Sequence, residues 1–217
     1  ARGVYKNTDM DVRSYKKMKM YVHAESFPNE APLGNSAATV FIRLGSDYTN
    51  NYYEYEIPLT VTPPNSNYQS GSIQDQYKVW PAENEMILDF KSLQTAKQLR
   101  NIDMLNNRNI TLQTPYSIQD PNDASKRVTV LGNPNLSTVK TIMIGIRNPN
   151  DGGSSICGEV WVNELRLTDF DEKGGWAANA RVTAKLADFG TLSLAGSIST
   201  PGFGSIEKKV GDRSRET

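Results

Sequence analysis

The segment KMKMYVHAE, residues 17–25, determines the fold class, because apolar and polar side chains alternate along it. Its apolar face consists of Met18, Met20, Val22 and Ala24. Its polar face consists of Lys17, Lys19, Tyr21 and His23. A period of two residues is that of a β-strand with one buried face and one face in water. The segment therefore predicts a sheet that covers a hydrophobic core.

Further strand patterns follow, separated by loops rich in Pro, Gly, Asn and Asp. They occupy residues 38–45, 52–61, 127–131, 140–147 and 158–168. One short helix is expected between Asp89 and Arg100. Its apolar stripe would consist of Phe90, Leu93, Ala96 and Leu99. These elements predict an all-β fold, an antiparallel jelly-roll-like β-sandwich with one short helix. The expected core includes Val22, Val40, Ile42, Ile57, Ile142, Ile144, Val162 and Leu165.

The strand at residues 158–168 changes its apolar face along its length. In a regular strand, Val160 and Val162 lie on one face. Leu165 and Leu167 then lie on the opposite face. Two explanations are open: both faces are buried, or a bulge near residues 163–164 restores a single apolar face.

The overall charge argues against a nucleic-acid partner. Lys and Arg together number 24, as do Asp and Glu, so the net charge is zero and no strong field gathers a polyanion. No apolar run reaches the length of a spanning helix. Residues 1–7 lack the apolar core of a signal peptide, and residues 208–217 form a polar run. We expect an internal fragment of a longer protein.

The composition shifts to small residues after residue 175, and a β-hairpin pattern begins. Two segments of alternating residues flank a tight turn at residues 188–190. We expect two domains, a soluble sandwich at residues 1–172 and the hairpin with a polar tail at residues 173–217. Segments of about ten residues with one apolar face suit an outer-membrane barrel. An ordinary amphipathic hairpin that covers the sandwich is the alternative, and periodicity alone leaves both open.

If the hairpin belongs to a barrel wall, one of its faces contacts lipid. The expected membrane-facing residues are Ala178, Ala180, Val182, Ala184, Leu186, Leu192, Leu194 and Ile198. Trp176 would lie in an aromatic girdle at the membrane surface.

Three segments carry a resemblance to a known family: GEVWVNELRLTDF at residues 158–170, GGWAANA at residues 174–180, and LADFG at residues 186–190. They resemble the SprA/Sov family of very large outer-membrane β-barrel proteins from Bacteroidetes. That family is the translocon of the type IX secretion system, which exports folded proteins and supports gliding motility. The resemblance implies an outer-membrane or cell-surface location. It also implies other secretion-system subunits, exported proteins and outer-membrane lipid as partners, with the sandwich capping or lining the pore.

No residue pattern indicates bond chemistry, and we expect neither an enzyme nor a cofactor. His23 is the only histidine and lies within a strand, so a structural role is expected. Cys157 is expected to be a small buried residue. The carboxylates Asp151, Asp169, Asp171 and Glu172 lack the spacing of a calcium loop and are expected to be solvated, so no metal site is predicted.

A tyrosine cluster supports one alternative function. Its members are Tyr48, Tyr52, Tyr53 and Tyr55. Aromatic side chains stack on sugars when they form an exposed platform, which would make the domain a cell-surface carbohydrate-binding β-sandwich. More often such residues pack across a sheet.

Overall fold

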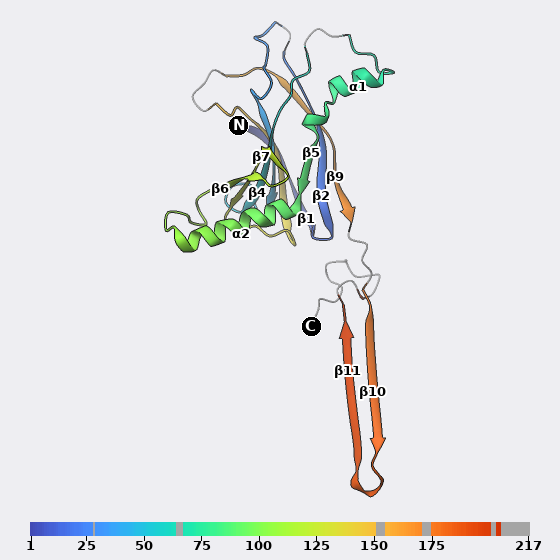
Figure 1. Ribbon diagram of the computed structural model, residues 1–217. Coiled ribbons are helices and arrows are strands. Elements are labelled where there is room, and N and C mark those ends of the chain that lie inside the picture. The colour runs from blue at the N-terminus through green and yellow to red at the C-terminus, as the bar shows by residue number, and fades with distance from the viewer. Residues whose placement is uncertain (28, 64–66, 151–154, 171–174, 201–202, 205–217) are drawn as a thin grey trace. The chain divides into compact units, whose positions relative to one another are not determined.

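Figure 1 shows a computed structural model of the chain, which describes residues 1–27, 29–63, 67–150, 155–170, 175–200 and 203–204. The chain divides into two compact units, Ala1–Phe170 and Asp171–Thr217. The expected domain boundary, between residues 172 and 173, lies beside this division. Among the described residues, the first unit contains two sheets and two α-helices, and the second contains a hairpin.

The first unit is built from antiparallel sheets that face each other across a hydrophobic core. The larger sheet has six strands. In spatial order these are β1 (Arg2–Met10), β8 (Val139–Arg147), β3 (Thr39–Gly45), β4 (Tyr52–Pro58), β7 (Asp123–Leu131) and β6 (Tyr116–Asp120). The smaller sheet has three strands, in the order β5 (Met86–Asp89), β2 (Tyr15–Glu25) and β9 (Glu159–Phe170). The expectation of a mostly-β, sandwich-like fold is therefore confirmed.

The alternating residues of β2 pack as the sequence predicts. Its apolar face is buried, with Val22 only 1% exposed. Val40, Ile42 and Ile57, from β3 and β4, are fully buried in the same cluster. The expected core is correct for these four residues, because each lies on the inner face of a strand at the centre of its sheet.

The expected core is wrong for the strands at one side of the sandwich. Val162 and Leu165 of β9 are 42% and 39% exposed. Ile142 and Ile144 of β8 are only partly buried, although they pack against the core. The reason is position, because β9 is an edge strand, and β1, which covers β8, is the edge strand of the other sheet. The periodicity of a strand does not reveal whether it lies at an edge.

A bulge in β9 resolves its change of face. Lys19 pairs with Arg166 and Tyr21 pairs with Asn163, so the register shifts by one residue between them. Glu164 takes the extra position with a φ of 54°, in the left-handed region. Leu165 is thereby returned to the face that carries Val162. The bulge predicted near residues 163–164 is confirmed.

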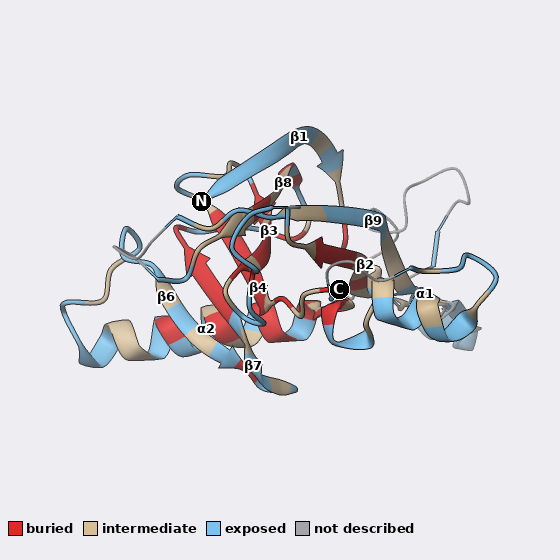
Figure 2. Ribbon diagram, turned by 90° about the horizontal axis from the view of Figure 1, so that it is seen from above, coloured by how far each residue is buried: buried red, intermediate tan, exposed pale blue. Residues whose placement is uncertain are grey.

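Helix α2 (Phe90–Asn106) closes one side of the sandwich. It packs against β6 and β7 of the larger sheet and against β2 and β5 of the smaller sheet, as Figure 2 shows from above. Asp89 caps its first turn by accepting a hydrogen bond of 2.8 Å from the backbone N–H of Lys91. Phe90, Leu93 and Ala96 are buried as expected. The opposite side of the sandwich, between β1 and β9, is not covered by a helix of the described chain.

The expectation for the helices was wrong in three respects: their number, the length of α2 and the burial of Leu99. The described chain has a second helix, α1 (Ile73–Val79), in a segment expected to be a polar loop; Ser72 caps it. Helix α2 continues beyond Arg100 to Asn106, and Leu99 is 39% exposed because the buried stripe continues through Arg100 instead. Neither described helix has the length and apolar composition needed to cross a membrane.

Three strands of the first unit were missed: the four-residue β5, which directly precedes α2, and two strands whose sequences are polar. Strand β1 reads RGVYKNTDM and β6 reads YSIQD, and both are edge strands. An edge strand has one neighbour and at most one buried face, so it needs few apolar residues. Strand β1 forms because Val4 pairs with Ile144 and because Gly3 lies opposite Gly145, where a side chain would collide.

Candidate functional site: a two-faced hairpin

The second unit contains a fully paired hairpin, formed by β10 (Ala177–Lys185) and β11 (Thr191–Ser199). Its register is regular from Ala177 opposite Ser199 to Lys185 opposite Thr191. Each strand has nine residues, close to the 9–11 or so that a tilted membrane strand requires. The hairpin therefore has the dimensions of one wall segment of a barrel.

The pairing places apolar residues opposite apolar residues. Directly opposite partners share a face of a sheet, so the pairs define two faces. The apolar face consists of the pairs Ala178 with Ile198, Ala180 with Gly196, Val182 with Leu194, and Ala184 with Leu192. The polar face includes the pair Thr183 and Ser193, whose hydroxyls lie 3.3 Å apart. Seven of the eight expected membrane-facing residues thus share one face, while Leu186 lies just beyond β10.

The apolar face is exposed. Val182 and Leu194, its central pair, are each 61% exposed. Leu192 and Ile198 are similarly exposed. Large apolar side chains that share a bare face mark a surface made for another apolar environment.

Aromatic residues lie at both ends of the hairpin. At the open end, the backbone carbonyl of Trp176 accepts a hydrogen bond of 2.9 Å from the N–H of Thr200. At the closed end, a single 3₁₀ turn (Ala187–Phe189) presents Phe189, which is 97% exposed. From the sequence only Trp176 was expected in a girdle, because Phe189 lies in the turn at residues 188–190. The position of Phe189 between the two alternating segments indicates a second aromatic residue, at the opposite end of the hairpin from Trp176.

His23 is held by structural contacts on the outer face of β2. Its Nδ1 lies 2.7 Å from the carbonyl oxygen of Val79 and 3.1 Å from the hydroxyl of Thr62. The rings of Trp80 and Trp161 flank it. The carboxylate of Glu25 lies 3.4 Å from Nε2 of His23. These contacts join β2 to the end of α1.

Cys157 is exposed, so the expectation that it is buried was wrong. It lies in the loop before β9, beside a cavity, rather than inside the strand. Among the carboxylates weighed for calcium, Asp169 forms an ion pair of 3.1 Å with Lys17. Asp151, Asp171 and Glu172 lie outside the described residues. The described part of the chain has no group of three His, Cys, Asp or Glu side chains able to hold a metal ion.

The tyrosine cluster does not form one platform in the described structure. Tyr53 and Tyr55 are buried between the sheets. Burial raises the pKa of Tyr53 to about 12, against the lowering effect of Arg100. Tyr52 lies on the outer face, where the guanidinium of Arg43 sits 4.0 Å from its ring centroid. Tyr48 stacks on Tyr5 of β1 instead.

A charged network covers the outer face of the larger sheet. Glu54 accepts hydrogen bonds from Arg43 at 2.7 Å and from Arg147 at 3.0 Å. Glu56 pairs with Arg127 and Arg147. Both glutamates are buried, each 4% exposed, and are paired with cations from neighbouring strands. The network sets three guanidinium groups against two carboxylates and links β3, β4, β7 and β8.

The comparisons with known proteins point to secretion and motility. The SprA_N family model, described as a motility related/secretion protein, matches residues 1–217. No curated protein matches the chain. The resemblance carried by the last third of the sequence thus extends over the sandwich as well. The chain belongs to the SprA_N family of motility related/secretion proteins.

Proposed function

We propose that this chain is part of an outer-membrane translocon of type IX secretion, with β10 and β11 as two strands of the barrel wall. The observation that carries the proposal is the hairpin register, which places every large apolar side chain of β11 opposite an apolar or small partner. Lipid on one side and a polar lumen on the other require this division. Family membership in secretion and motility supports the same function.

In this proposal the first unit projects into water and caps or lines the pore. Its mechanism in this proposal is steric and conformational. Exported proteins and other secretion-system subunits are its partners, and the location is the outer membrane or cell surface. The jelly-roll connectivity expected from the sequence is also part of the proposal. No contact of the described tyrosines favours a carbohydrate-binding function.

The two faces of the hairpin should respond in opposite ways to a positive charge. In the intact protein, Val182→Arg or Leu194→Arg should cost about 2 to 4 kcal/mol if the site lies at the bilayer midplane. Thr183→Arg is the matched control, because it adds the same charge to the polar face one residue away. Assembly into membranes, followed by the urea dependence of unfolding, measures the difference. Equal tolerance at the two faces would exclude a lipid-facing hairpin.

Spin labels test the same assignment without adding charge. Labels at Ala180 and Val182 should report lipid contact in native membranes, whereas labels at Thr183 and Lys185 should report water. Water exposure at all four positions would rule out the barrel wall.

A further inference from the structure

The sandwich is asymmetric, because only one of its two sides is closed. Helix α2 inserts Phe90, Leu93 and Ala96 between the sheets on the side of β5 and β6. On the other side, β1 and β9 face each other as the edge strands of the two sheets. Val4 of β1 is 71% exposed there, and Leu165 of β9 is 39% exposed. The inner faces of both edge strands are therefore incompletely covered.

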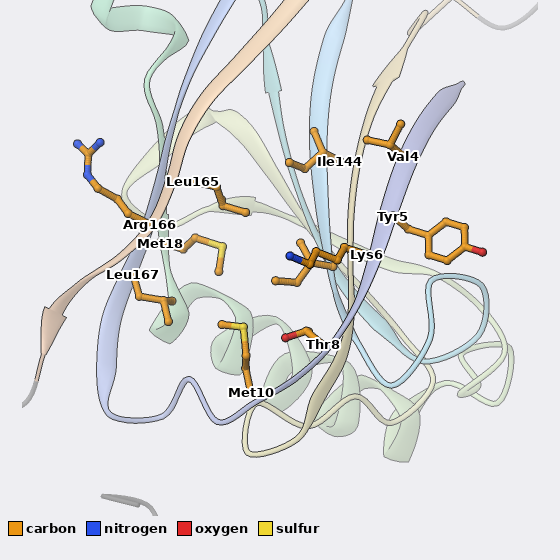
Figure 3. Close-up of a pocket in the computed structure, with 11 residues that line it drawn as sticks. Val4, Tyr5, Lys6, Thr8, Met10, Met18, Ile144, Leu165, Arg166 and Leu167 are labelled. Carbon is orange, nitrogen blue, oxygen red and sulfur yellow. The ribbon is translucent and has the colours of Figure 1, made fainter.

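Two cavities follow this open side. One has a volume of about 380 Å³ and lies between β1, β8 and β9; Figure 3 shows Val4, Ile144, Met18, Leu165 and Leu167 around it. The other, of about 620 Å³, continues toward the start of β1 and is lined by Arg2, Ile146 and Val160 among others. Together they accompany β1 along most of its length. A volume of this shape fits an extended chain better than a compact ligand.

The charges along these cavities have one sign. Arg2 and Lys6 lie on the inner face of β1, two positions on either side of Val4. Within the described residues neither forms an ion pair, and no carboxylate lines either cavity. In Figure 3 Lys6 points into the cavity, whereas Tyr5 and Arg166 point away from it. Along the inner face of β1, the cations Arg2 and Lys6 thus lie on either side of the aliphatic Val4.

Strand β1 is the more suitable of the two edges for a new strand. Its register with β8 is regular from Arg2 to Asn7. Strand β9 has Glu164 and Asp169 at positive φ, and such irregularities interrupt an edge. The N–H and C=O groups on the outer edge of β1 meet no strand of the described chain. An extended peptide adds to such an edge through main-chain hydrogen bonds, and its alternate side chains enter the adjacent cavities.

We propose that β1 receives an extended segment of a partner polypeptide as a seventh strand of the larger sheet. The segment has the pattern carboxylate, any residue, aliphatic, any residue, carboxylate. Its two carboxylates pair with Arg2 and Lys6, and its aliphatic residue packs between Val4 and Leu165. The hairpin takes no part, so a negative result here leaves the membrane assignment of β10 and β11 unaffected.

The test uses the 217-residue chain and a fluorescent synthetic peptide as long as β1. In the peptide, valine alternates with threonine, and aspartates replace the two valines intended to face Arg2 and Lys6. Fluorescence anisotropy should show saturable binding. Lys6→Glu should weaken binding by about tenfold or more, and a peptide with lysine at the position that faces it should recover the loss. Lys91→Glu, the same charge change on α2, should leave binding unchanged.

Amide hydrogen exchange locates the peptide. Exchange should slow along β1 on binding and stay unchanged along β6, the other edge of the same sheet. Equal binding of the aspartate and lysine peptides to the parent chain would overturn the proposal, as would protection along β9 without protection along β1. A dimer that Leu165→Arg dissociates in analytical ultracentrifugation would show that a second copy covers this side instead, and would also overturn it.

Discussion

Two isoleucines that face each other across β3 and β8 differ in how far the core encloses them. Ile42 and Ile144 are direct cross-strand partners. Ile42 is fully buried, with Tyr55 as its partner on the other side, whereas Ile144 borders the open cavity beside β1. An isoleucine side chain in this sheet thus contributes a different free energy of folding according to which neighbours cover it.

Ile42→Ala should lower the free energy of unfolding by about 2 to 5 kcal/mol, as a full cavity-forming substitution does. Ile144→Ala should cost less, because water already reaches its surroundings and the site can rearrange. Urea unfolding of both variants, followed by circular dichroism, measures the difference. A larger loss for Ile144→Ala would mean that the cavity beside β1 is closed in solution.

Asp47 stabilises the turn between β3 and β4 only while it is ionised. Burial acts to raise its pKa, but hydrogen bonds from the N–H groups of Asn50 and Thr49 and from the side chain of Asn51 hold the pKa well below its usual range. A carboxyl with a lowered folded pKa contributes stability above the unfolded pKa of about 4 and loses it as pH falls toward the folded value.

The stability difference between the parent chain and Asp47→Asn should therefore be largest near neutral pH and should shrink below about pH 4. Urea unfolding over a pH series measures it. Asp9→Asn, at an exposed position on β1, is the control and should show no such trend. A constant difference across the series would show that the charge of Asp47 is unimportant.

At the scale of one element, the bulge in β9 sets which side chains enter the sandwich. If Glu164 occupied a regular strand position, Leu165 and Leu167 would lie on the face opposite Val162. The bulge also forces Glu164 into the left-handed region, at a φ of 54°. Glycine adopts this region without steric cost.

Deleting Glu164 should therefore leave the inward face of β9 unchanged and cost little stability, because Asn163, Leu165 and Arg166 would then follow Tyr21, Met20 and Lys19 in regular register. Glu164→Gly should change stability by only about 1 kcal/mol or less, since relief of the strained φ offsets the loss of an exposed ion pair with Arg166. Thermal unfolding compares the two. A deletion variant far less stable than the glycine variant would place the bulge elsewhere, because the deletion would then turn the apolar side chains after it outward.

At the scale of the molecule, the two units should be separable. All residues of the buried core cluster lie between Val12 and Val139, within the first unit. A chain that ends at Phe170 should unfold cooperatively at the same urea midpoint as the 217-residue chain, monitored by circular dichroism. A lower midpoint or a broadened transition would show that the hairpin unit supports the sandwich.

The sequence predicted those parts of the fold in which the pattern of side chains is compatible with only one local structure. The alternation around Val22 and around Val182 each specified a strand and its two faces. The polar strand β1 was missed because it is stabilised by pairing with the apolar strand β8. The sequence of β1 alone gives no indication of that partner. Val162 and Leu165 were placed in the core because periodicity identifies an inward face but not an edge. The role of Lys6 was also missed, because it depends on the cavity that β8 and β9 form beside this side chain.

The order of the strands also determines when the first unit can fold. Strand β2 pairs with β9, and β1 pairs with β8. These strands near the start of the chain therefore pair with residues more than a hundred positions later. Such distant pairings slow folding, because the intervening chain must be ordered before they form. The hairpin pairs with itself across one turn and has no such delay. Until β9 is available, β2 can pair only with β5, over residues 17–20, and the rest of its edge stays open to wrong partners.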